Sequence, residues 1–150
     1  MSGFRLVRSN SEANDIENWD YTTISVSYGD LLEMDTGATL ATVGDSSTEA
    51  WQRMGVVVGD PYISGASSSA VAVIPVNPQQ IWEAESANNS DAAHNGDGMA
   101  LTDTNTVNNS GTNSNAATAV CVQVGPSGVA ADKKILVRFY DATGSTAQSF

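Results

Sequence analysis

Four side chains with oxygen ligands lie close together in one Asn- and Gly-rich stretch, namely Asp91, Asn95, Asp97 and Asp103. Carboxylate and amide oxygens are the ligands that Ca²⁺ prefers, which makes this stretch a candidate cation site. The spacing matches neither the EF-hand loop nor the nonapeptide Ca²⁺ repeat. His94, in the same stretch, has no Cys or second His with which to share a metal. We therefore expect a solvated loop with Asx turns and no metal.

A second acidic motif, Asp35-Thr36-Gly37, is similar to the signature of retroviral-type aspartic proteases. In that family two chains each supply one Asp, because the chemistry needs two close carboxyls that share a proton. The surrounding residues fit poorly, since Glu33 stands where the family has apolar residues and the later element Val57-Val58-Gly59 comes too early. We interpret Asp35–Gly37 as a hairpin turn.

The remaining reactive side chains form no catalytic motif. Cys121 is the single cysteine, so it forms neither an intramolecular disulfide nor part of a Cys-rich metal site. Its apolar neighbours predict a small buried hydrophobe. The sequence also lacks a Gly-x-Ser-x-Gly nucleophile elbow and a phosphate-binding glycine loop. We predict that the protein is not an enzyme and uses no cofactor.

The charge balance limits the classes of partner. The formal net charge is -11 and only 15% of the residues are charged. Phosphates would repel such a chain, so we expect it to bind neither nucleic acid nor anionic membrane surfaces. No apolar run reaches the length of a membrane span, and the first residues lack the apolar core of a signal peptide. We expect synthesis in a cytoplasm and exit by a route such as cell lysis.

Short runs of alternating or continuous apolar residues predict strands throughout the chain. These runs cover residues 22–28, 31–34, 38–43, 51–58, 71–76, 79–85, 117–124 and 133–140. Polar insertions at 86–97 and 104–116 flank a short ordered piece, Met99–Leu101. No helical apolar period persists, so we predict an all-β fold, a small β-barrel or β-sandwich with long polar loops.

Three features of these runs predict how the strands are buried. Ile135, Val137 and Phe139 share one face of their strand, which we expect to face the core. Trp51 and Trp82 also lie in predicted strands and should be core residues. Pro75 lacks an amide donor, so its strand should lie at a sheet edge or end there.

The chain divides into an extended N-terminal arm (1–20), a single β domain (21–140) and a C-terminal tail (141–150). The arm is expected to be poorly packed. It carries Arg5 and Arg8 on an otherwise acidic chain, which favours docking on an acidic partner. Trp19, at the junction of arm and domain, would pack on a neighbouring chain or cap the barrel.

Residues 24–140 resemble the small capsid decoration (cement) proteins of tailed bacteriophages. The similar segments are an early hairpin, a following strand, a mid-chain strand and a closing strand. They correspond to Gly29–Gly37, Gly55–Val58, Ile74–Ala84 and Lys134–Phe139. The resemblance implies a β-rich knob, often a homotrimer, that binds the outside of an expanded icosahedral capsid and stabilises it.

If the chain follows these proteins, its partners are the major capsid protein and neighbouring copies of itself. It would be made in the host cytoplasm and lie on the outer surface of the virion. An N-terminal arm that orders on binding can cover a large surface. The candidate capsid-contact residues are Phe4, Arg5, Leu6, Val7, Arg8 and Trp19.

A different class of function is also compatible with the residues. In this alternative, the chain is a receptor- or glycan-binding module on a virion surface. The polar loops at 86–97 and 104–116, with Trp82 nearby, would form the site. Solvent-exposed aromatic side chains beside these loops would favour it.

Overall fold

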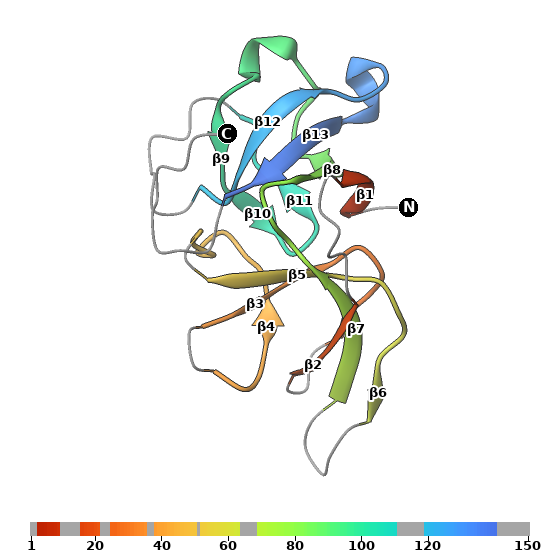
Figure 1. Ribbon diagram of the computed structural model, residues 1–150. Coiled ribbons are helices and arrows are strands. Elements are labelled where there is room, and N and C mark those ends of the chain that lie inside the picture. Colours follow the sequence, from red (N-terminus) through yellow and green to blue (C-terminus); the bar gives the residue numbers. More distant parts are fainter. Residues whose placement is uncertain are drawn as a thin grey trace.

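The computed structural model shows two β-sheets stacked along the molecule, with residues 76–79 leading from one sheet to the other (Figure 1). It describes residues 3–9, 16–21, 25–35, 38–50, 52–63, 69–110 and 119–140. In these ranges the secondary structure is strand apart from two 3-10 turns, η1 (Ala92–His94) and η2 (Ala130–Asp132). The predicted all-β class is confirmed, and no α-helix occurs in the described part of the chain.

The first sheet is a seven-stranded, barrel-like sheet with the strand order β10-β11-β8-β13-β12-β9, and β1 pairs with β8. Its strands are β1 (Arg5–Ser9), β8 (Gln80–Ser86), β9 (Gly98–Met99), β10 (Leu101–Asp103), β11 (Thr106–Val107), β12 (Cys121–Pro126) and β13 (Lys134–Phe139). The two ends of the order, β9 and β10, are separated only by Ala100. Asn108 N donates to Ala100 O on one side, and Val120 N donates to Met99 O on the other. This shared segment nearly closes the barrel.

The second sheet has six strands in the order β2-β7-β5-β3-β4, with β6 also paired to β7. Its strands are β2 (Glu17–Tyr21), β3 (Leu31–Met34), β4 (Thr42–Val43), β5 (Arg53–Val57), β6 (Tyr62–Ile63) and β7 (Ser69–Pro75). A parallel bridge joins Tyr21 to Ala41, so β2 at one edge contacts the segment that leads into β4 at the other. The predicted hairpin is confirmed in part, since Leu32 pairs with Val43.

Two hydrophobic cores meet at strands β3 and β5. Leu31 and Val56 pack in the larger core with Trp82 and Phe139, inside the barrel-like sheet. The next residue of each strand, Leu32 and Val57, packs in the smaller core of the second sheet. Successive side chains of a strand point to opposite faces, so β3 and β5 are buried on both faces and hold the two sheets together.

The alternating patterns predicted the burial of the long strands well. Along β13 the inward residues Ile135, Val137 and Phe139 are fully buried, as expected. Trp82 is a core residue, with 1% of its surface exposed. Strand β7 ends at Pro75, as its missing amide donor predicted. Trp51 lies outside the described residues.

Two predictions about the first third of the chain are wrong. Residues 3–9 and 17–20 are not a poorly packed arm, because β1 pairs with β8 and β2 pairs with β7. A strand over 22–28 is not found at 25–28, where Ser27 and Tyr28 lead into a turn at Gly29. Residues 22–24 and the predicted tail, 141–150, lie outside the described residues.

Candidate functional site

Two of the candidate contact residues, Arg5 and Arg8, lie on the outer face of three neighbouring strands. Arg5 pairs with Glu83, and Glu83 in turn pairs with Leu136, so these side chains share the face opposite the core. We call this surface the β1–β8–β13 face. Its outward side chains are Arg5, Arg8, Ile81, Glu83, Glu85, Lys134, Leu136 and Arg138.

Ion pairs and hydrogen bonds hold the charged side chains of this face in place. Arg5 lies 3.2 Å from the Glu83 carboxylate, and Ser127 Oγ donates to the same carboxylate at 2.7 Å. The Ser127 hydrogen bond, helped by Arg5, lowers the pKa of Glu83 below its usual value and keeps it ionised. Arg138 donates to the Pro78 carbonyl at 2.9 Å. Contacts within the chain therefore hold Arg5, Glu83 and Arg138 on this face.

A β-bulge interrupts the pairing of β1 with β8. The register shifts between Leu6, opposite Trp82, and Arg8, opposite Ile81, which leaves Val7 as the extra residue. Val7 is 48% exposed, and Arg5 and Arg8 are also exposed. These three side chains are accessible, and their role in capsid contact stays a prediction.

The other candidate side chains near the N-terminus face the core. Phe4 is only 1% exposed, and its ring lies 5.3 Å from that of Phe139. Leu6 is half-buried against the same core. The expectation that Phe4 is available on a loose arm is wrong, because its backbone amide donates to Gly29 O and its ring completes the barrel interior. It stabilises the fold.

Trp19 is also buried, with 3% of its surface exposed. The Arg53 guanidinium lies over its ring, and the Trp19 indole nitrogen donates to Glu17 at 3.1 Å. Trp19 therefore packs in the smaller core of its own chain, and its packing on a neighbouring chain stays a prediction. The alternation of Trp19 and Tyr21 in a polar stretch was the signal that residues 17–21 form a strand.

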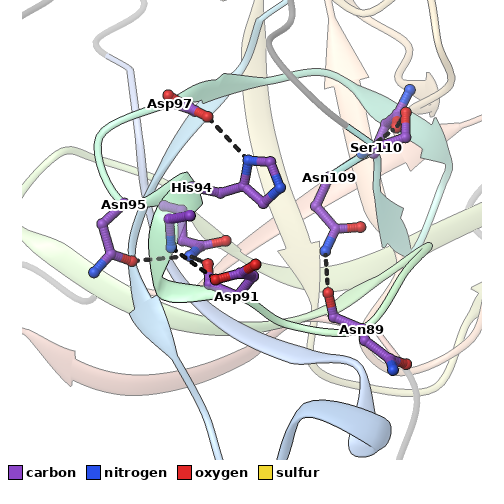
Figure 2. Close-up of polar contacts among 10 residues, drawn as sticks. Asn89, Asp91, His94, Asn95, Asp97, Asn109 and Ser110 are labelled. Carbon is purple, nitrogen blue, oxygen red and sulfur yellow. Dashed lines mark hydrogen bonds and ion pairs between the residues drawn. The ribbon is translucent and has the colours of Figure 1, made fainter.

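The polar insertion at 86–97 is a well-bonded loop at one end of the barrel-like sheet (Figure 2). Asp91 caps the η1 turn by accepting from Ala93 N at 2.9 Å, and His94 Nδ1 lies 3.0 Å from Asp97 Oδ2. Gln123, from β12, enters this loop and donates to the Asp91 carbonyl and to Asn95 Oδ1, each at 2.8 Å. The predicted Asx turn is confirmed at Asp91.

The second polar insertion joins the first through Asn109. Its side-chain nitrogen donates to the carbonyls of Asn88 and Asn89, each at 3.1 Å, and its side-chain oxygen accepts from Asn88 N at 2.8 Å (Figure 2). Asn109 is only 2% exposed, so this polar contact is buried. Residues 111–116 of the insertion lie outside the described residues.

The polar loops bring together little reactive chemistry. Asp97 can orient the His94 imidazole, at 3.0 Å from its Nδ1, and the Ser110 hydroxyl donates to Asn108 Oδ1 at 2.6 Å. Asp103 lies apart on β10, where it caps Asn105 N. In the described ranges, no three His, Cys, Asp or Glu side chains converge on one point.

Asp35, the first residue of the protease-like motif, lies in a turn that directly follows β3. The Asp35 carbonyl accepts from Ala38 N at 2.9 Å, and its exposed carboxylate accepts from Gln52 Nε2 at 2.7 Å. Thr36 and Gly37 lie outside the described residues. What is described agrees with the predicted hairpin turn.

Comparison with known proteins identifies no relative. No protein-family model matches the chain, and neither a curated protein nor a solved structure matches it significantly. The part of the chain that the structure describes contains no helix long and apolar enough to cross a membrane.

Proposed function

We propose that the protein is a non-catalytic structural component of a bacteriophage virion, which binds the outer surface of the icosahedral capsid and stabilises it. The β1–β8–β13 face is the docking surface in this proposal. The observation that carries it is the charge of this face. It presents four basic and two acidic side chains, a net charge of +2, on a chain whose net charge is -11.

The shape of the face supports the same role. Val7 is pushed outward by the bulge next to Arg8, so an exposed apolar side chain lies beside a cation. An acidic partner surface with a shallow apolar patch would match both. Because a capsid carries many equivalent positions, weak single contacts suffice if neighbouring copies also touch, as they would in a homotrimer.

Co-sedimentation of the purified chain with undecorated, expanded capsids from its presumed phage tests the proposal. We expect saturation at a copy number that matches the capsid symmetry, and capsids that are harder to disrupt. Arg8→Glu should weaken binding by about tenfold or more, since it places a like charge against the acidic partner.

Lys133→Glu is the matched control. It changes the net charge equally but lies in the turn after η2 and not on the three strands. It should bind as the unmodified chain does. Equal losses for both variants would indicate a general charge effect, and no binding by the unmodified chain would refute the proposal.

Receptor or glycan binding at the polar loops is the alternative function. The abundant amide and carboxylate groups of residues 86–97 favour it, since such groups recognise hydroxyls. The aromatic platform expected from Trp82 is not at the surface, because Trp82 is buried and donates to Gln80. A glycan-binding screen would follow if capsids did not bind the chain.

A further inference from the structure

A second β-bulge exposes an apolar side chain on the barrel-like sheet. In the pairing of β12 with β13 the register shifts between Gln123 and Gly125, which leaves Val124 as the extra residue. Val124 is 38% exposed. Gly125 pairs with Leu136, whose side chain points away from the core. A small apolar surface therefore lies on β12 and β13, separated from β1 by β8.

A cation without an acidic partner borders this apolar surface. Arg138 follows Leu136 by two residues on β13, so both side chains lie on the outer face. The Arg138 guanidinium donates to the Pro78 carbonyl, and no carboxylate in the described ranges forms an ion pair with it. Lys134, on the other side of Leu136, is already paired with Glu85. Arg138 therefore keeps N–H donors for the carboxylate of a partner.

The second sheet carries a surface of the opposite charge around Leu40, which is 41% exposed. Leu40 precedes Ala41, which forms the parallel bridge with Tyr21. Because this bridge is buried in the smaller core, Asp20 and Leu40, the residues before its two members, lie side by side and point outward. Residues 9–52 contain no Lys or Arg. An exposed apolar side chain thus lies beside a carboxylate, in a stretch without basic residues.

We propose that Val124, Leu136 and Arg138 of one copy, here called the β12–β13 patch, bind Leu40 and Asp20 of a second copy of this chain. Each of the two surfaces combines an exposed apolar side chain with a charge, and the two charges are opposite. Since both surfaces belong to the same chain, a second copy supplies the complementary partner.

The two surfaces lie on different sheets, so the contact between copies is head to tail (Figure 1). Each copy can then bind one neighbour through the β12–β13 patch and another through Leu40. Such a heterologous contact closes into a ring or extends into a chain of copies, depending on the rotation between them.

This contact is independent of capsid binding. It uses neither Val7 nor Arg8, so β1 stays accessible for the docking that the proposed function assigns to it. It also supplies the contact between neighbouring copies that the proposed function invokes. Its test needs no capsid, so a negative result would leave capsid docking untouched.

Sedimentation equilibrium of the purified chain, from about 10 μM to about 1 mM, tests the contact. We expect the average mass to rise above that of the monomer as the concentration increases. The rise should be smaller at high salt, because salt screens the pairing of Arg138 with Asp20. A monomer mass over the whole range would overturn the proposal.

Arg138→Glu and Asp20→Arg each damage one of the two surfaces. Either substitution should raise the Kd of self-association by about tenfold or more, because it replaces attraction by repulsion. A mixture of the two variants should form a heterodimer and nothing larger, since each variant keeps the surface that the other lacks. Full self-association of either variant, or a mixture that stays monomeric, would refute the head-to-tail contact.

Lys133→Glu and Asp60→Arg are the matched controls, because they make the same charge changes at exposed residues outside the two surfaces. Both should self-associate as the unmodified chain does, and equal losses in the controls would overturn the proposal. Val124→Asp tests the patch at an exposed position that makes no contact with Pro78. It should also weaken self-association, and an unchanged Kd would refute the assigned patch. Urea unfolding checks that each variant is folded.

Discussion

The guanidinium carbon of Arg53 lies 5.1 Å from the centre of the Trp19 ring, so a cation covers the edge of the smaller core. The same guanidinium donates to the Glu17 carboxylate at 2.7 Å. That hydrogen bond is the main reason why the pKa of Glu17 lies below its usual value. Three side chains from β2 and β5 thus form one contact that joins strands far apart in the sequence.

Replacing Arg53 should weaken this contact. We expect Arg53→Ala to lower the free energy of unfolding by about 0.5–1.5 kcal/mol, because it removes a cation–π contact and a partly exposed ion pair. Arg53→Lys, which keeps the charge, should lose less. Urea unfolding followed by tryptophan fluorescence measures both. The contribution of ionised Glu17 to stability is present above its unfolded pKa and is lost as the pH falls through its lower folded pKa. The difference in unfolding free energy between the unmodified chain and Arg53→Ala should therefore be smaller in acid than at neutral pH.

Phe4 and Val7 give a direct test of how the N-terminal strand packs. Phe4→Ala should lower the unfolding free energy by about 3–5 kcal/mol, since it empties a buried position against Phe139. Val7→Ala should change it by less than about 0.5 kcal/mol, because Val7 is at the surface. Similar small effects of both substitutions on urea unfolding would show that the strand is not docked in solution.

Two glycines allow the cost of an unfavourable backbone conformation to be distinguished from the cost of a steric clash. Gly3 and Gly96 both have a φ of +89°, where a side chain is unfavourable. A Cβ at Gly3 would lie 2.5 Å from Gly29 O, whereas one at Gly96 would meet nothing within 4 Å. Gly96→Ala should therefore lower the unfolding free energy by about 1 kcal/mol and Gly3→Ala by more, about 2–4 kcal/mol. Equal effects in chemical denaturation would contradict the close approach at Gly3.

The ionisation of Asp30 should make the stability of the folded protein depend on pH. Burial raises the pKa of its carboxyl above the usual value. A raised folded pKa favours the folded state below the unfolded pKa, and this advantage is lost as the pH rises through the folded pKa. We expect Asp30→Asn to be more stable than the unmodified chain at pH 7, with a smaller difference at pH 4.

Asp45→Asn is the contrasting control for this pH response. Hydrogen bonds from Ser47 lower the pKa of Asp45, so its ionised form favours the folded state at neutral pH. This variant should be less stable than the unmodified chain at pH 7. Urea midpoints at pH 7 and pH 4 give both comparisons, and a shift of the same sign for the two variants would contradict the assignment.

Cys121 should be unreactive in the folded protein. Burial raises the pKa of its thiol to about 12, and its sulfur lies 3.8 Å from the Met99 carbonyl. Since the thiolate is the reacting form, a thiol reagent at pH 8 should modify Cys121 only as the protein unfolds. Rapid modification without denaturant would show that the barrel opens near β12.

The sequence predicted best the strands whose two faces differ most. On β13 the buried residues Ile135, Val137 and Phe139 alternate with half-buried ones, and on β8 the residues on either side of buried Trp82 are half-buried. This two-residue period predicts a strand with one buried face. Strand β1 was missed because it is short and its bulge breaks the alternation at Val7. In strand β2 Trp19 and Tyr21 alternate, but the polar residues around them also fit an extended, solvated segment, so the local pattern does not decide for a strand.

The candidate sites depend on contacts between residues that are distant in the sequence, and local sequence patterns do not predict such contacts. The β1–β8–β13 face joins Arg5 to Glu83 and Leu136, which are distant in the sequence and meet only through strand pairing. Gln123 reaches the 90–97 loop from β12, and the sequence near Asp91 carries no signal for that contact. Sequence spacing grouped Asp103 with Asp91, but the fold places Asp103 on β10.

The closure at Ala100 has a consequence for how the chain tolerates change. One short segment supplies a strand to each end of the barrel-like sheet, and Ala100 links the two. Inserting a single residue there would shift β10 against β11 or β9 against β12, and would leave a strand edge unpaired. Unpaired edges recruit other chains. We therefore expect a chain with a residue inserted at Ala100 to aggregate in solution at temperatures below its Tm.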